Sequence, residues 1–336
     1  MSPQRHISNI TIPESEYKHS ASNNTKNTQA FIPLTYKTSL EAVKLMIGVV
    51  GRNIDGWGTT QLKLSLEKQG VSFAFFKFSS LVARVGYSLQ VSKNGVNLET
   101  DLSALIIRPI GRGSLEEIIF RMDLLHSLER HDVLIINPAS AIERCVDKYY
   151  ALKLLEENGV PVPRTMVTES TKDALKGFHE LGEDIVLKPL FGSRGVGSTR
   201  ISDKEVATRI FNSIKFQHGV FYLQEFIPHG GSDIRAFVVG DQVVAAMRRV
   251  GNSWKTNVSQ GARPAAIQLN NELETLAVEA AKIVDCKVAG VDILERSDEP
   301  LVIELNSQPG WNGLQSVTKV NIADCIADYV LSEVKR

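Results

Sequence analysis

Two carboxylates and one carboxamide near the end of the chain have the chemistry to hold a metal ion. The segment reads VAGVDILERSDEPLVIELNSQPGW, which predicts strands at 288–294 and 301–305 joined by a polar turn. Because side chains alternate along a strand, Glu304 and Asn306 project to one face, and Asp292 lies on the partner strand. Such hard oxygen ligands suit Mg2+, which takes its remaining ligands from water and phosphates. Taken alone, the segment also fits two half-exposed strands with solvated acids.

A lysine upstream occupies a position where an anion would stabilise it. We expect a helix at 148–158, with Asp147 as its N-cap and Gly159 ending it. Lys148 in the first turn opposes the helix macrodipole, whereas a polyphosphate at that helix start would be attracted. A solvated surface lysine is the alternative.

A second lysine precedes a glycine-rich loop. Lys188 lies in the strand expected at 185–189, directly before FGSRGVG, and the chain then re-enters a strand at 198–201. This strand–loop–strand order lacks the helix and the G-K-[ST] ending of a P-loop. Gly195 and Gly197 allow backbone N–H groups to approach phosphates without obstruction. The pattern predicts a glycine flap.

The next strand, YLQEFI, predicts a nucleotide-binding edge. Its residues Gln224, Glu225 and Phe226 lie at an apolar strand that ends at a proline, where backbone donors and acceptors could meet an adenine. No side chain here identifies the base.

A hairpin with strands at 233–239 and 242–249 follows, turning at Gly-Asp. Asp233 and Arg235 share one face of it. A two-residue turn predicts that Asp233 faces Arg248, so that Arg249 points away.

The stretch WKTNVSQGA adds Lys255 and Asn257 to a basic, amide-bearing patch. The alternative is a surface hairpin with charge pairs worth little.

The first part of the chain must position these groups. Apolar strands at 44–50, 71–78, 104–108 and 133–136 alternate with helices, which predicts a small parallel α/β domain. The helices are expected at 61–69 and 114–130, the second opened by a capping box between Ser114 and Glu117.

A dinucleotide-binding oxidoreductase is disfavoured for this domain. Its first loop holds Gly51, Gly56 and Gly58 but no G-x-G-x-x-G, and Asp55 comes too early to hold a ribose.

Composition excludes several other classes. The 336 residues suffice for two or three domains. Lys plus Arg equals Asp plus Glu, 38 each, so we expect neither nucleic acid nor a membrane as partner. No apolar run approaches about 18 residues, which argues against a membrane span.

The cysteines and the first residues bear on the compartment. Cys145, Cys286 and Cys325 lie far apart in sequence with no CxxC, as expected in a reducing cytoplasm rather than in a disulfide framework. The first residues are rich in Ser, Thr and Asn without a signal-peptide core. We expect 1–42 to be a disordered tail.

The order of these motifs resembles the ATP-grasp fold, and more narrowly the RimK-like amino-acid ligases. The resemblance covers about residues 45–336 and rests on these motifs: Lys148, Lys188 with its flap, Gln224-Glu225-Phe226-Ile227, Asp233-Ile234-Arg235, Lys255-Thr256-Asn257, Asp292 and Glu304-Leu305-Asn306. The resemblance implies the α/β fold class, with a parallel α/β domain followed by an α+β ATP-grasp domain. The small parallel pre-ATP-grasp domain would span 43–140 and the two-subdomain ATP-grasp domain 141–336, divided at about 160–228 and 229–336.

The resemblance also implies roles for the motif residues. Lys148, Lys188, Gly195, Gly197, Gln224, Glu225, Phe226 and Asp233 would bind ATP; Asp292, Glu304 and Asn306 would hold two Mg2+ or Mn2+ ions; Arg235, Arg249, Lys255 and Asn257 would act on the acyl phosphate, the acceptor and the incoming glutamate. Strand geometry favours Arg248, whereas the resemblance favours Arg249; a β-bulge would reconcile them in favour of Arg249.

RPIGRGSLEEIIFRMD, IERCVDKYY and NSQPGWNGLQ are most similar to tetrahydromethanopterin glutamate ligases. This similarity implies ATP-dependent transfer of L-glutamate to a carboxylate of a small pterin coenzyme through an acyl phosphate, in an enzyme expected to be a homo-oligomer. Trp254 and Trp311 are candidates to stack on the pterin. A deazaflavin coenzyme, a ribosomal-protein C-terminus and an amino-group carrier protein remain alternative acceptors, because Lys255-Thr256-Asn257 replaces the usual Arg-Ser-Asn. A non-catalytic nucleotide-binding module is the alternative outside the enzymes.

Overall fold

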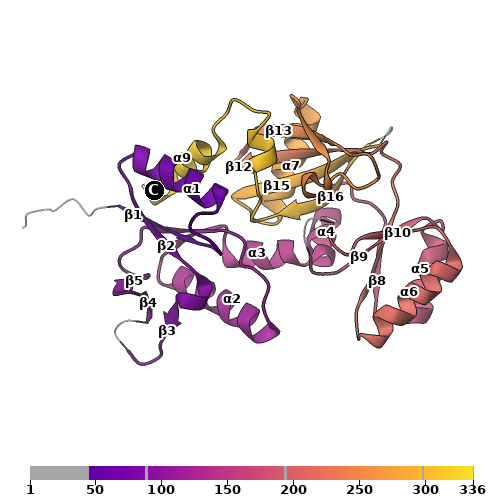
Figure 1. Ribbon diagram of the computed structural model, residues 1–336, viewed down its shortest axis with the longest axis horizontal. Helices are drawn as coiled ribbons and strands as arrows, with labels where there is room; N and C mark the ends of the chain where they lie inside the picture. The colour runs from indigo at the N-terminus through magenta and orange to yellow at the C-terminus, as the bar shows by residue number, and fades with distance from the viewer. Residues whose placement is uncertain (1–44, 88–89, 193–194, 297–298, 336) are drawn as a thin grey trace, which may run out of the picture. The chain divides into compact units, whose positions relative to one another are not determined.

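The computed structural model describes residues 45–87, 90–192, 195–296 and 299–335 (Figure 1). The expected tail, 1–42, lies outside the described residues.

The first part is a parallel sheet with helices on both faces. Its strand order is β2-β1-β6-β7, with all neighbours parallel, as predicted from the alternating pattern. The strands are β1 (Met46–Val50), β2 (Ser72–Phe76), β6 (Ala104–Ile107) and β7 (Leu134–Ile136). The crossover helices are α1 (Trp57–Lys68) and α2 (Leu115–Arg130).

Helix boundaries were predicted unevenly. Ser114 and Glu117 form the expected capping box at the start of α2. Helix α1 begins at Trp57, not at residue 61, with Gly56 as its N-cap. Gly58 therefore lies in the first turn of α1 and not in the preceding loop. Glycine is tolerated there because this turn packs tightly against its neighbours. A Cβ at Gly58 would lie 3.1 Å from Arg108 Nη2.

Alternating side chains of β1 serve two separate cores. Ile47 and Val49 join the cluster that contains Leu62 of α1, whereas Val50 joins the cluster that contains Leu125 of α2. Helices α1 and α2 therefore lie on opposite faces of the sheet (Figure 1).

The last helix, α9 (Ile322–Val334), packs against α1 (Figure 1). Ser65 Oγ donates to Asp324 Oδ1 at 2.7 Å, and Gln69 Nε2 donates to Asp328 Oδ1 at 2.8 Å. Helix α9 therefore contributes to the hydrophobic core that α1 forms with the first sheet. Smaller elements beside the first sheet are a 3-10 turn (Phe78–Ser80) and the short strands β3 (Val82–Ala83), β4 (Val91–Lys93) and β5 (Val96–Asn97).

Two helices connect the first sheet to the second, α3 (Ala139–Val146) and α4 (Lys148–Glu157). Asp147 caps α4 as predicted, accepting from the N–H of Tyr149 at 2.9 Å and of Tyr150 at 3.1 Å.

The second sheet is antiparallel with order β10-β9-β11-β8. Its strands are β8 (Thr165–Thr168), β9 (Ile185–Lys188), β10 (Thr199–Ile201) and β11 (Phe221–Glu225), and its helices are α5 (Thr171–Glu180) and α6 (Lys204–Phe216). Phe178, Phe211 and Phe221 fill the core beneath those helices.

The third sheet is antiparallel with order β14-β13-β12-β15-β16. Its strands are β12 (Ser232–Val239), β13 (Gln242–Val250), β14 (Arg263–Ala266), β15 (Val288–Glu295) and β16 (Pro300–Asn306), accompanied by α7 (Asn271–Ile283), α8 (Asn312–Gln315) and a 3-10 turn (Val258–Gln260). Helix α7 packs on β12, β13, β15 and β16.

The register of the β12–β13 hairpin differs from the one that the turn predicted. The pairing shifts between Phe237 and Val238, so Asp233 faces Arg249 and not Arg248. The extra residue of the bulge moves every position beyond it by one, which the two-residue turn alone could not reveal.

Candidate active site

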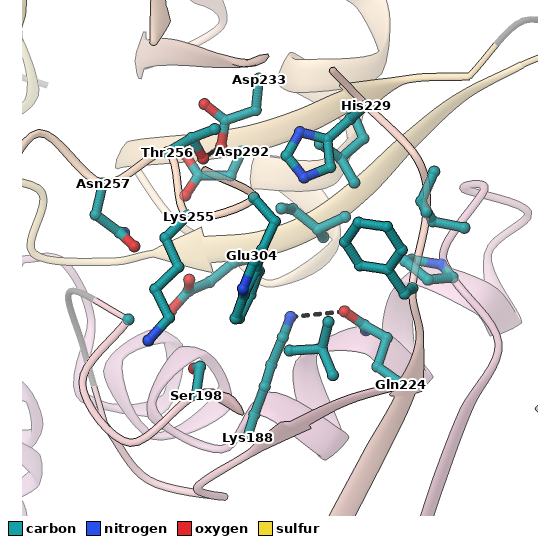
Figure 2. A pocket seen from close by; sticks show the side chains of 18 of the residues that line it. Lys188, Ser198, Gln224, His229, Asp233, Lys255, Thr256, Asn257, Asp292 and Glu304 are labelled. Carbon is teal, nitrogen blue, oxygen red and sulfur yellow. Dashed lines mark hydrogen bonds between the residues drawn. The ribbon is translucent and has the colours of Figure 1, made fainter. Parts of the chain in front are cut away.

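A cavity lies between the second and third sheets and holds most of the predicted residues (Figure 2). It contains about 840 Å3, counting space open to solvent. Twelve predicted residues line it: Lys148, Lys188, Gly195, Gln224, Glu225, Phe226, Asp233, Arg249, Lys255, Asn257, Asp292 and Glu304. Gly197, Arg235 and Asn306 do not line it.

Strand β9 carries the buried lysine of the cavity. Lys188 Nζ donates to Gln224 Oε1 at 2.6 Å across the β9–β11 pair (Figure 2). Burial lowers the pKa of Lys188 to about 8; the charge of Glu304 opposes this shift, and the charge of Lys148 adds to it. Such a lysine gains a counter-charge when an anion enters the cavity.

The other lysine is fastened to the flap. Lys148 Nζ donates to the carbonyl oxygen of Gly192 at 2.7 Å. Burial also lowers the pKa of Lys148, against the attraction of Glu304 and Asp147. Both lysines are therefore held at the cavity by contacts that a phosphate can replace.

The glycine flap has the predicted strand–loop–strand form, since β9 and β10 pair antiparallel. Gly195 and Gly197 have φ of +66° and +82°. A Cβ at Gly195 would overlap Asn257 Oδ1 and lie 3.0 Å from Gln260 Nε2. The flap therefore meets the loop that carries Lys255 and Asn257.

Buried ion pairs form the wall opposite the lysines. Arg249 Nε donates to Asp233 Oδ1 at 2.7 Å, and its Nη2 also contacts Asp233 Oδ2 and lies 3.0 Å from Asp292 Oδ2. The Thr256 hydroxyl donates to Asp233 Oδ2 at 2.7 Å. Asp233 thus holds Arg249 and Thr256 in place, and the nucleotide contact that the resemblance implied for it stays a prediction.

Arg235 binds Asp292 through Nε and Nη2, the latter at 2.6 Å from Asp292 Oδ2. Desolvation alone would raise the pKa of Asp292, but the charges of Arg235 and Arg249 outweigh it and hold that pKa below its usual value. Asp292 is ionised and already engaged by two guanidinium groups.

Asp292 lies on the strand beside Glu304, as predicted, and a register shift between Asp292 and Ile293 places the two acids directly opposite each other. Within the described part of the chain Glu304 forms no ion pair, and it attracts the two lysines. Asn306 lies two positions along the same strand face, and its Nδ2 is buried with no partner among the described residues.

These donor groups suit a magnesium–nucleotide complex rather than a protein-only metal cage. In the described ranges there is no group of three or more His, Cys, Asp and Glu residues that could hold an ion. One free carboxylate, the Asn306 amide oxygen and the remaining lone pairs of Asp292 leave most coordination positions to phosphate and water, as Mg2+ prefers.

An aromatic group forms the apolar end of the cavity. Phe226 lies edge-on to Trp254 with centroids 6.5 Å apart, and the Arg200 guanidinium lies 3.5 Å over the Phe226 ring. The Glu225 carboxylate is bound by Arg164, whose Nε donates at 2.7 Å. This ion pair holds the Glu225 side chain at the edge of the cavity.

The two tryptophans have different environments from those expected. Trp311 is 1 % exposed and packs against Trp57 and Phe237, so the expectation that it stacks on a ligand is wrong. Trp254 does line the cavity, but beside Phe226, which puts it at the apolar nucleotide end.

Several lining residues were not among the predicted site residues, and those that bear a polar side chain or a ring include Pro163, Ser198, His229 and Thr256. Thr256 stands inside the Lys255–Asn257 motif, and Ser198 directly follows the flap, so proximity to motifs could have found both. His229 Nδ1 contacts the carbonyl oxygen of Ser232 at 3.1 Å, and nothing in the sequence marks it.

No helix within the described residues is long and apolar enough to cross a membrane.

Comparisons with known proteins agree with this geometry. A model of the RimK-like ATP-grasp domain matches residues 145–330. A tetrahydromethanopterin:alpha-L-glutamate ligase of Methanococcus maripaludis is 36% identical over 87% of this chain and 99% of its own length. Its counterpart in Methanocaldococcus jannaschii is 38% identical over 81% of this chain and 93% of its own.

Solved structures share the fold. The ATP-grasp ligase PsnB, complexed with a precursor variant, Mg and ADP, has a TM-score of 0.68 at 22% identity, covering 87% of this chain and 99% of PsnB. A RimK domain ATP-grasp protein of Sphaerobacter thermophilus has a TM-score of 0.69 at 20% identity, covering 85% of this chain and 99% of its own. Because the family match spans more than half of the chain and the relatives align along nearly their whole lengths, this chain belongs to the RimK-like ATP-grasp family and is an ATP-dependent carboxylate–amine ligase.

Proposed function

We propose that this ligase joins the amino group of L-glutamate to a carboxylate of a reduced, tetrahydromethanopterin-like pterin coenzyme, through an acyl phosphate, with release of ADP and phosphate. The observation that carries the chemistry is the cavity in which Lys148 and Lys188 face Glu304 beneath a glycine flap. The identity of the substrates is supported by the relatives named for that reaction, which align with most of this chain.

The lysines would bind the phosphates of ATP. Lys188 is buried without a carboxylate in contact, and its hydrogen bond to Gln224 can be exchanged for one to a phosphate oxygen. Lys148 would follow the flap, since it is bonded to Gly192. The adenine would lie against Phe226 and Trp254 at the apolar end.

Glu304 and Asn306 would hold Mg2+, with Asp292 contributing a lone pair; a second ion, or Mn2+ in its place, is part of the same proposal. Mg2+, when bound, neutralises phosphate charge and so favours attack on phosphorus. Glu304, which forms no ion pair within the described residues and faces Asp292, supports this assignment.

The first step would form the acyl phosphate. An oxygen of the acceptor carboxylate bonds to the γ-phosphorus, the bond from that phosphorus to the bridging oxygen breaks, and ADP leaves with the electron pair. Arg249 and Lys255 border the cavity and would stabilise the charge on the transferred group.

The second step would form the amide. The glutamate nitrogen bonds to the acyl carbon, phosphate leaves with the carbon–oxygen electron pair, and the amine proton passes to solvent. Asn257, which the flap contacts, would orient the intermediate, and Arg235, bound to Asp292, would fix the wall behind it.

The acceptor is tested by product mass. The enzyme is incubated with ATP, Mg2+ and glutamate, and with a reduced pterin coenzyme, a deazaflavin coenzyme, a peptide ending in glutamate, or an amino-group carrier protein. A mass gain of one glutamyl residue on the pterin is expected. A clear preference for the peptide would reassign the enzyme to ribosomal-protein modification, and no product with any acceptor would refute glutamate ligation.

The nucleotide product tests the intermediate. Acyl-phosphate chemistry leaves ADP and phosphate, whereas adenylation leaves AMP and pyrophosphate. Finding AMP in amounts equal to the amide product would reject the proposed route.

A further inference from the structure

We propose that Arg108, together with Arg52 and Arg112, forms an anion-binding subsite in the first domain. It would hold an acidic group of the acceptor, carboxylate or phosphate, other than the carboxylate that reacts. The identity of the acceptor rests on the proposed function. The preference for an anion rests on the arginines themselves and on the N–H groups beside them.

The three arginines lie at the topological switch point of the first sheet. Strands β1 and β6 are neighbours, with Val50 facing Ile107 at their carboxyl ends. Their crossover helices α1 and α2 cover opposite faces of the sheet (Figure 1). In open α/β sheets the crevice between two such strand ends is the usual binding place for a ligand. The loops 51–56 and 108–114 leave from this crevice.

Arg108 is a half-buried cation that lacks an anionic partner among the described residues. Its Nη1 donates to the carbonyl oxygen of Pro309 at 3.1 Å, and its guanidinium lies 4.4 Å from the centroid of Trp311. Burial lowers the pKa of Arg108 to about 10, so it remains charged at neutral pH. No carboxylate among the described residues pairs with it. A half-buried, uncompensated charge costs free energy that a bound anion would recover.

Arg52 and Arg112 extend the positive charge to the surface. Both are exposed and form no ion pair within the described ranges, unlike the arginines of the main cavity. A Cβ at Gly111 would lie 3.2 Å from Arg52 Cδ, so the Arg52 side chain already packs on the loop that carries Arg112. The acids nearest in sequence, Asp55 and Glu116, do not pair with either arginine.

The neighbouring segment offers donors without acceptors. Asn306 Nδ2, Gln308 Nε2 and Trp311 Nε1 are buried and have no partner among the described residues. Gln308 has its Oε1 occupied by the N–H of Ile110, at 3.2 Å, so only its amide nitrogen is left. Gln308 and Arg108 border the same small cavity. A site that presents cations and N–H donors selects an oxygen-rich anion.

The subsite is connected to the reaction centre through Pro309. A Cβ at Gly290 would lie 3.1 Å from Arg235 Nη1 and 3.1 Å from Pro309 Cβ, so Arg235 and Pro309 flank the same backbone position. Arg108 binds Pro309 from the other side, and Arg235 binds Asp292. An acceptor anchored at the arginines can therefore present a second acidic group to the cavity that holds ATP.

Steady-state kinetics of Arg52→Gln, Arg112→Gln and the double variant test the subsite, with the acceptor that the mass assay identifies. We expect KM for the acceptor to rise about tenfold or more, because each arginine contributes charge-assisted hydrogen bonds, while KM for ATP stays within about twofold. An acceptor analogue with its non-reacting acidic groups esterified should show the raised KM on the wild-type enzyme and no further rise on the variants. Arg130→Gln is the matched control, since Arg130 is exposed at the opposite end of α2.

A binding measurement separates this inference from the proposed function and from the source of the anion. Inorganic phosphate, added without acceptor to protein whose main cavity is saturated with ATP and Mg2+, should raise Tm of the wild-type protein and of Arg130→Gln, but not of the double variant. If the wild type transfers glutamate to no acceptor, the proposed function fails while this titration still decides the subsite. Unchanged acceptor KM in the double variant would overturn the acceptor role, and a phosphate response that survives in the double variant would overturn the site.

Discussion

Asp292 and Glu304 face each other on adjacent strands, yet they have different partners. Asp292 is held by Arg235 and lies 3.0 Å from Arg249 Nη2, whereas Glu304 forms no ion pair in the described ranges. The two acids are therefore not interchangeable ligands. Asp292 organises the cationic wall, and Glu304 is the carboxylate that is free for a metal ion and faces the lysines.

Glu304→Gln is expected to lower kcat by at least roughly a hundredfold, because it removes the free carboxylate of the metal site. Unfolding free energy should change by less than about 1 kcal/mol, since the residue has no ion pair to lose. ADP release and thermal melting measure the two effects. Glu295→Gln, at the last residue of β15 and outside the cavity, is the activity control. Full activity of Glu304→Gln, or of the wild-type enzyme in excess chelator, would refute the metal site.

The lowered pKa of Lys188 predicts a pH dependence for ATP use. The amine is charged below its pKa of about 8 and neutral above it, so kcat/KM for ATP should fall as pH rises through about 8. Bound phosphates favour the charged amine, so kcat should persist to higher pH. ADP is quantified by chromatography across pH 6–10. In Lys188→Arg the charge cannot be lost, and the fall near pH 8 should disappear; a flat wild-type profile would contradict the assignment.

Gly195→Ala tests the closure of the flap. Gly195 has φ of +66°, and a Cβ there would overlap Asn257 Oδ1, so alanine should hold the flap away from its partner loop. KM for ATP is expected to rise roughly tenfold. Gly182→Ala carries a similar backbone cost, with φ of +91° and nothing within 4 Å, but it lies outside the cavity. It should lower Tm and leave KM unchanged, and equal KM values for both variants would disprove the flap contact.

Trp254→Ala should raise KM for ATP more than KM for the acceptor. Trp254 contacts Phe226 edge-on, and the loss of such an aromatic contact costs about 0.5–1.5 kcal/mol, or roughly twofold to tenfold in affinity. Trp254→Phe keeps most of the contact and should recover most of the affinity. A larger change in acceptor KM would restore the sequence-based prediction that this ring stacks on the acceptor.

Asn137 is expected to be a stability determinant outside the cavity. Its Oδ1 accepts from the N–H groups of Lys287 at 2.7 Å and of Val288 at 2.8 Å, and its Nδ2 donates to the carbonyl oxygens of Val288, at 2.7 Å, and of Ser307. Asn137→Ala leaves these buried groups unpaired and should cost about 3 kcal/mol in denaturant unfolding. Asn158→Ala, whose single side-chain bond is exposed, is the control; equal losses would contradict this role.

The sequence by itself determined the local elements and the order of the motifs. Strand and helix periodicity predicted the parallel first sheet, because burial on one or both faces leaves a repeat in the sequence. Capping residues such as Ser114 and Asp147 fixed helix starts, since their side chains bond to the backbone only a few residues away. The sequence also predicted that Asp292 and Glu304 lie on two adjacent strands, but a register shift between Asp292 and Ile293 decides that they face each other.

Only the tertiary structure decided which partners these groups have. Arg249 replaced Arg248 in the site because a single bulge at Phe237 shifts the register, and no local signal marks that bulge. Trp311 became a core residue because α1 and the third sheet close around it. Cys145 and Cys286, distant in sequence, come to 3.5 Å between their sulfur atoms. Contacts of this kind depend on packing between segments far apart in the chain, so neither residue type nor spacing contains them.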